Sequence, residues 1–176
     1  MKHLLSIIFV LSTLLFFSCE NPTSPNLDEK GVDELKSLEM DHKIDKQEMH
    51  YQDIIYVPIY SDIYIDDQNP KNLLAATLSI RNTSYQDSLF ISKIEYFNTH
   101  GDLVRNFIEK PISLPPMATV NYVIEKEDDT GGSGANFIVA LNAKSSNVKP
   151  LIQAIMIGQY SNKGFAFSTD GCSIKK

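Results

Sequence analysis

Hydrophobic and polar residues alternate most regularly along residues 74–82. One parity of this segment is apolar and consists of Leu74, Ala76, Leu78 and Ile80. The other parity consists of Ala75, Thr77, Ser79 and Arg81. Because successive side chains of a β-strand point to opposite faces, this pattern predicts a strand with one face in the core and one toward solvent. Such a strand is typical of an antiparallel sheet that is packed on one side.

Further short apolar segments lie before and after this one, separated by residues that favour turns. They are residues 54–65, 89–97, 103–108, 118–124, 137–141 and 151–157. Within residues 89–97 the apolar positions change phase, which predicts a β-bulge near Ser92 and Lys93. Residues 151–157 are more continuously apolar, as expected of a central strand.

Together these segments predict about seven or eight short strands, with turns roughly every 8–12 residues and no convincing helix. This pattern indicates an all-β domain, an antiparallel β-sandwich of immunoglobulin-like character, with a small barrel as the alternative. The chain has 176 residues, of which 43% are hydrophobic, and this is enough for one such domain with appendages.

The N-terminal segment is organised like a secretory signal. Lys2 precedes an apolar run, residues 4–17, that is shorter than the ~20 residues a helix needs to cross a bilayer. Residues 16–19, Phe-Phe-Ser-Cys, resemble a bacterial lipobox. The resemblance implies cleavage before Cys19, a diacylglycerol on its sulfur and an acyl chain such as palmitate on its amino group, which together give stable anchoring. The alternatives are an ordinary cleaved signal with a chance cysteine, or an uncleaved anchor.

We therefore divide the chain into a lipoprotein signal peptide (residues 1–18), a lipid-anchored tether (residues 19–53) and a β-sandwich domain (residues 54–170). The tether is rich in charge and has only a thin apolar stripe, so we expect it to be flexible, with one weak helix around residues 33–48. The expected location is the bacterial cell envelope, at the outer membrane or the periplasmic face, and the lipid anchor makes the membrane a partner.

The charge of the chain argues against nucleic acid as a partner. The net charge of −6 becomes −7 when residues 1–18 are removed, because Lys2 is the only charged residue among them. An acidic surface without a Lys/Arg cluster repels a phosphate backbone. The chain has two cysteines, Cys19 and Cys172. If Cys19 carries the lipid, Cys172 has no partner, and the fold must stand without a disulfide.

Four runs of residues, 56–61, 76–83, 131–137 and 154–158, resemble a bacterial family, domain of unknown function 3124. The resemblance covers most of residues 56–167, and the four runs are more specific as a set than singly. It implies a small exported or lipid-anchored bacterial protein. It implies no activity, substrate or catalytic residue.

Two loops carry residue types that occur in functional sites. Residues 131–134, Gly-Gly-Ser-Gly, lack the lysine and helix of a phosphate-binding loop, and Ala135 replaces the second glycine of a nucleophile elbow. We expect this loop to be flexible and to let backbone segments pass closely. The acids Glu125, Glu127, Asp128 and Asp129 offer oxygen ligands to calcium, but adjacent acids in a loop more often face water. We assign no catalytic residue, metal ligand or cofactor from the sequence.

Tyr56, Tyr60 and Tyr64 share one parity, and the opposite parity of this segment is almost wholly aliphatic. If the segment is one strand, the three tyrosines form a row on its outer face, which would suit a partner surface or sugar rings. This row is the candidate binding face. The alternatives are that Pro58 or the polar residues 61–62 break the register, or that the row packs beneath a loop.

These observations favour a non-catalytic binding or structural module that is anchored by lipid in the envelope and binds an envelope protein or a glycan. The alternative is an envelope enzyme that acts on a glycan or ester with acidic catalytic residues. An enzyme of that kind requires a cleft in which carboxylates have displaced pKa values. The scarcity of histidine, with four in the chain, and the absence of a catalytic motif favour the binding module.

Replacing the lipobox cysteine tests the predicted anchor. Cys19→Ala should abolish metabolic labelling with a radioactive fatty acid and leave precursor or soluble protein, because the thioether can no longer form. Cys172→Ala is the matched control and should label like the unchanged chain. Full labelling of the Cys19→Ala variant would contradict the prediction.

Overall fold

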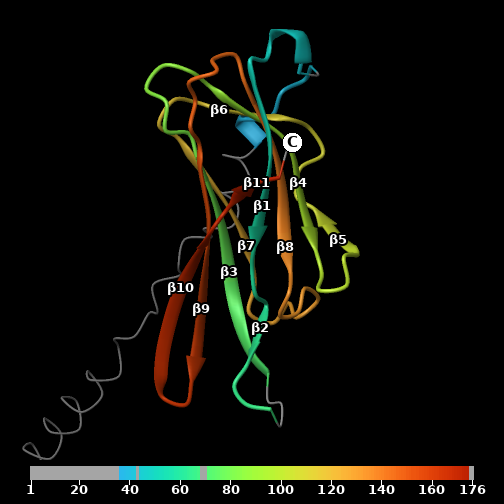
Figure 1. Ribbon diagram of the computed structural model, residues 1–176, viewed down its shortest axis with the longest axis vertical. Helices are drawn as coiled ribbons and strands as arrows, with labels where there is room; N and C mark the ends of the chain where they lie inside the picture. Colours follow the sequence, from blue (N-terminus) through green and yellow to red (C-terminus); the bar gives the residue numbers. More distant parts are fainter. Residues whose placement is uncertain (1–35, 43, 68–70, 175–176) are drawn as a thin grey trace, which may run out of the picture. The chain divides into compact units, whose positions relative to one another are not determined.

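The computed structural model describes residues 36–42, 44–67 and 71–174, which belong to one unit, Glu34–Lys176 (Figure 1). Cys19, the predicted signal peptide and the first part of the predicted tether lie outside the described residues. No helix in the described ranges is long and apolar enough to span a membrane.

The described residues form mainly strands, together with the helical residues 36–37 and one short 3-10 helix, η2 (Lys46–Glu48). The strands are β1 (Tyr51–Pro58), β2 (Asp62–Tyr64), β3 (Lys71–Arg81), β4 (Leu89–Phe97), β5 (Leu103–Asn106), β6 (Ile112–Leu114), β7 (Thr119–Ile124), β8 (Asn136–Ala143), β9 (Leu151–Tyr160), β10 (Lys163–Asp170) and β11 (Cys172–Ser173).

These strands make two sheets in which every pairing is antiparallel. The six-stranded sheet has the order β11-β1-β8-β4-β5, with β6 also paired to β4 (Figure 1). The five-stranded sheet has the order β10-β9-β3-β2, with β7 also paired to β3. The sheets do not close into one barrel. The predicted all-β antiparallel sandwich is therefore confirmed, and the barrel alternative is wrong.

The alternating pattern positions the core as predicted. In β3 the apolar parity is fully buried, and it packs with the inner faces of both sheets into one hydrophobic cluster. In β4 the register against β8 shifts between Ile91 and Lys93, which confirms the predicted bulge. Because of this bulge, Leu89 and Ile91 point into the core together with Ile94 and Tyr96.

The outer face of β9 differs from the prediction. The strand does lie between β10 and β3, as expected of an internal strand. However, its continuous apolar run is buried on one face only. Leu151, Ile155 and Ile157 remain 40%, 37% and 56% exposed on the outer face.

The boundary between tether and sandwich also differs from the prediction. β1 begins at Tyr51, three residues earlier than expected, and β11 extends the sandwich past residue 170. Glu39 forms a bridge with Ile112, and Leu38 packs against the core. Among the described residues, the expected helix is limited to residues 36–37 and η2, and the backbone of Leu38 and Met40 is instead hydrogen-bonded to Ser113 and Pro111.

The chain changes sheets directly after β1. β1 belongs to the six-stranded sheet, whereas β2 pairs with β3 in the five-stranded sheet. Residues 59–61, the crossover segment, connect the two strands. Pro58 ends β1, and it cannot donate a hydrogen bond to continue the ladder.

Candidate functional site

A pocket of about 240 Å³ lies where the crossover segment enters β2. Its walls come from four places in the chain: β2, the start of β3, the loop between β4 and β5, and the loop between β7 and β8. The lining residues are Tyr64, Lys71, Asn98, Thr99, His100, Asp129, Thr130, Gly131, Gly132 and Ser133.

The crossover segment is hydrogen-bonded on both sides. The backbone N–H of Ile59 donates to Ala135 O (3.0 Å), and that of Ser61 donates to Gly132 O (3.1 Å). From β3, the N–H of Leu74 donates to Ser61 O (2.8 Å). Ile59 and Ser61 are 1% and 0% exposed, so these bonds satisfy backbone groups that water does not reach. The segment thereby ties the glycine-rich loop to the five-stranded sheet.

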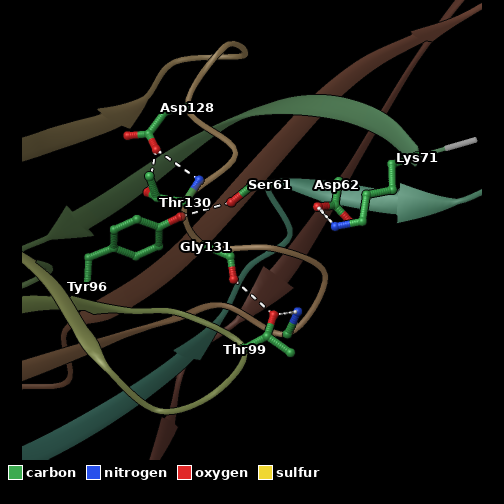
Figure 2. Close-up of polar contacts among 9 residues, drawn as sticks. Ser61, Asp62, Lys71, Tyr96, Thr99, Asp128, Thr130 and Gly131 are labelled. Atoms are coloured by element: carbon green, nitrogen blue, oxygen red, sulfur yellow. Dashed lines mark hydrogen bonds and ion pairs between the residues drawn. The ribbon is translucent and has the colours of Figure 1, made fainter.

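A buried pair of hydroxyl groups lies beneath the glycine-rich loop. Ser61 Oγ is 2.8 Å from Tyr96 Oη, and both residues are fully buried (Figure 2). Burial raises the pKa of the Tyr96 phenol, so the group stays neutral and available as a donor. Gly131 passes directly over this pair, and a Cβ at this position would lie 1.8 Å from Tyr96 Oη. Residue 131 must therefore be glycine for the loop to approach so closely.

Thr99 holds the glycine-rich loop from the other side. Its N–H and its Oγ1 both donate to Gly131 O, at 2.8 and 2.9 Å, and its Oγ1 accepts from the N–H of Gly134 at 2.9 Å (Figure 2). Gly132 has a φ of +75°, which favours glycine. The prediction that backbones pass closely here is confirmed. The expected flexibility of the loop stays a prediction, although Thr99 hydrogen-bonds to two of its residues.

A buried carboxylate stands next to the pocket. Asp62 is fully buried, and its Oδ2 is 3.1 Å from Lys71 Nζ (Figure 2). Asp62 Oδ1 has no hydrogen-bond partner among the described residues. The hydrogen bond from Lys71 and the charge of Asp62 raise the pKa of the lysine, with smaller contributions from Tyr64 and Asp129. Lys71 therefore remains an ammonium that faces the pocket while it compensates the charge of Asp62.

The acidic loop at residues 125–129 contributes in two ways. Asp129 lines the pocket. Asp128 pairs instead with Arg105 (2.9 Å), and its Oδ1 accepts hydrogen bonds from the N–H and the hydroxyl of Thr130. Asp128 thus fixes the segment that leads into the glycine-rich loop, a role beyond the solvated one expected for this acid.

The three tyrosines of the candidate binding face are not brought together. Tyr56 lies in the six-stranded sheet, opposite Ile138 and Cys172. Tyr60 follows the end of β1 and packs edge-on against Phe167, with ring centroids 5.9 Å apart. Tyr64 lies on β2 in the other sheet and lines the pocket. The predicted single outer row is wrong, because the crossover segment breaks the register, as the alternative reading allowed.

Most residues of the pocket were missed by the sequence reasoning. Lys71, Thr99 and His100 belong to no motif. Lys71 begins β3, whereas Thr99 and His100 are neighbours in the loop between β4 and β5, so no local spacing relates the lysine to the other two. The glycine-rich loop was the available signal, because two adjacent glycines indicate a close approach of backbones. Among the described residues, Cys172 is an exposed free cysteine.

The comparisons with known proteins identify a family but no activity. The family described as "Protein of unknown function (DUF3124)" matches residues 52–174. No curated protein matches the chain. A solved structure, "Crystal Structure of Thermotoga maritima 1070", is similar at 16% identity and a TM-score of 0.39, and the match covers 70% of this chain and 96% of that one.

Adding one methyl group at the glycine-rich loop tests its tight packing. Gly131→Ala should lower the free energy of unfolding by about 1–3 kcal/mol, because the new Cβ would overlap Tyr96 and Ser61. The measurement is denaturant unfolding followed by circular dichroism. Gly164→Ala is the matched control, since the nearest atom to its Cβ would be 3.9 Å away. Equal stability of the two variants would show that the loop is not packed as described.

Proposed function

Since the chain belongs to the family of proteins of unknown function DUF3124, whose description gives no activity, we propose a function from the chain's own residues. The protein is a non-catalytic binding module of the bacterial envelope, anchored through a lipid on Cys19. Its binding site is the pocket beside the glycine-rich loop. The ligand is neutral and rich in hydroxyl groups, such as one sugar unit of a glycan.

The observation that carries this proposal is the balance of charge at the pocket. Lys71 faces the pocket and is already paired with Asp62, while Asp129 adds a carboxylate to the wall. The Asp129 carboxylate would repel an anionic ligand, and the Lys71 ammonium would repel a cationic ligand. A hydroxyl group, in contrast, accepts a hydrogen bond from Lys71 and donates one to Asp129. Charged donors and acceptors make such hydrogen bonds strong.

The shape of the site supports the same class of ligand. Tyr64 is 57% exposed and lines the pocket, so its ring can lie against the apolar face of a sugar. The volume of about 240 Å³ is below the ~300–1,000 Å³ usual for sites that enclose drug-sized ligands. A single ring, or the end of a longer chain, suits a pocket of that size.

A second candidate function is hydrolysis of a glycan or ester. Glycoside hydrolysis usually needs two carboxyl groups that flank the scissile bond. Among the described residues, Asp129 is the acid that lines the pocket, and Asp62 is buried with Oδ2 bound to Lys71. Asp62 is therefore not placed to contact a substrate in the pocket, and this favours binding over catalysis.

Oligosaccharide binding by the full chain in detergent tests the proposal. The chain should bind neutral envelope oligosaccharides on an array, and Tyr64→Ala should weaken binding about fivefold to tenfold by removing one aromatic contact. Tyr85→Ala is the matched control, because Tyr85 is 84% exposed and does not line the pocket.

Two results would contradict the proposed function. The first is an absence of binding to every oligosaccharide tested, or equal binding by the Tyr64→Ala variant. The second is time-dependent cleavage of a bound oligosaccharide, which would favour the enzyme instead.

A further inference from the structure

β10 is an edge strand with little to prevent further pairing. It pairs with β9 on one side, and no other described strand pairs with its opposite side. An open edge presents unpaired N–H and C=O groups, and natural proteins usually block such edges with proline, inward charges, bulges or short strands. β10 has eight residues and an unbroken register, and its charged residues, Lys163 and Asp170, stand at its ends.

The two faces of β10 have distinct residue patterns. Phe165 and Phe167 stand on the inner face and are only half-buried, with their rings stacked 6.5 Å apart. The outer face carries the small exposed residues Gly164, Ala166 and Ser168. Tyr60 already packs against Phe167 from the crossover segment, but both phenylalanine rings remain partly exposed on a strand whose edge is open, where another strand could cover them further.

We propose that two copies of this chain pair through β10, antiparallel and around a two-fold axis at Ala166. A two-fold axis perpendicular to the sheet keeps inner side chains on the inner face. Directly opposed residues must then have the same parity. One residue is therefore opposed to its own copy, and the axis passes between these two copies. The pairing continues the five-stranded sheet from one copy into the other.

The sequence of β10 fits itself best at Ala166. This axis sets Phe165 of each copy opposite Phe167 of the other, which gives two cross-strand aromatic pairs, whereas an axis at either phenylalanine gives one. Such pairs stabilise antiparallel strands. Lys163 then lies opposite Thr169 of the second copy, so no like charges face each other. A second copy of β10 therefore supplies both opposed phenylalanines without opposing like charges, which an unrelated strand would do only by chance.

Disulfide trapping in the full chain tests both the partner and the register. In a Cys172→Ser background, Ala166→Cys places two thiols across the axis, where opposed Cα atoms are ~4.5–5.5 Å apart. That separation is within the ~4.4–6.8 Å range of disulfides, so a dimer should form rapidly under mild oxidation. Ser168→Cys is the matched control on the same exposed face. Its two copies lie four residues apart along the strand, ~13 Å, and should not cross-link.

Repulsion at the axis gives a second, independent test. Ala166→Lys should convert the dimer to a monomer in sedimentation of the full chain in detergent, because two ammonium groups would be opposed at the axis. Ala166→Glu should do the same, and a mixture of the two variants should restore the dimer. Ala166 is exposed, so the circular dichroism spectrum and melting temperature should change little. A monomeric unchanged chain, or equal cross-linking at residues 166 and 168, would overturn the proposal.

Discussion

The crossover segment is the constraint on which the rest of the site depends. Residues 59–61 carry the chain from one sheet of the sandwich to the other through the protein interior, where water does not satisfy polar groups. Backbone hydrogen bonds to Ala135 and Gly132 meet part of this requirement. A further backbone bond runs from Leu74 N–H to Ser61 O, and the buried contact between the Ser61 and Tyr96 hydroxyls joins the crossover to the six-stranded sheet.

The pocket follows from the same constraint. Asp62 directly follows the crossover and is buried. A buried charge needs a partner, and Lys71 at the start of β3 forms this ion pair. The hydroxyl pair leaves room for a backbone but not for a side chain, so glycine at residue 131 brings its loop against Tyr96. Thr99 then fixes the outer side of that loop. The pocket wall is thus a consequence of how the chain changes sheets.

The strands could be predicted from the sequence, because alternation records which side chains meet the core. The parity of β3 and the bulge in β4 both follow from the spacing of apolar residues. The prediction of a tyrosine row was wrong because parity relates side chains only within one strand. The crossover lies inside that apolar segment and divides it into two strands. Pro58 was the available signal for the break. The pocket could not be predicted, because Lys71 and Thr99 meet through long-range packing that no local pattern encodes.

A double-mutant cycle on the buried hydroxyl pair tests this account most directly. Ser61→Ala, Tyr96→Phe and the double variant each keep the shape of the core while they remove one or both hydroxyl groups. If the pair couples the crossover to the six-stranded sheet, the free energies of unfolding should be non-additive by about 1 kcal/mol, the usual net contribution of a buried hydrogen bond. Additive effects of the two substitutions would contradict it.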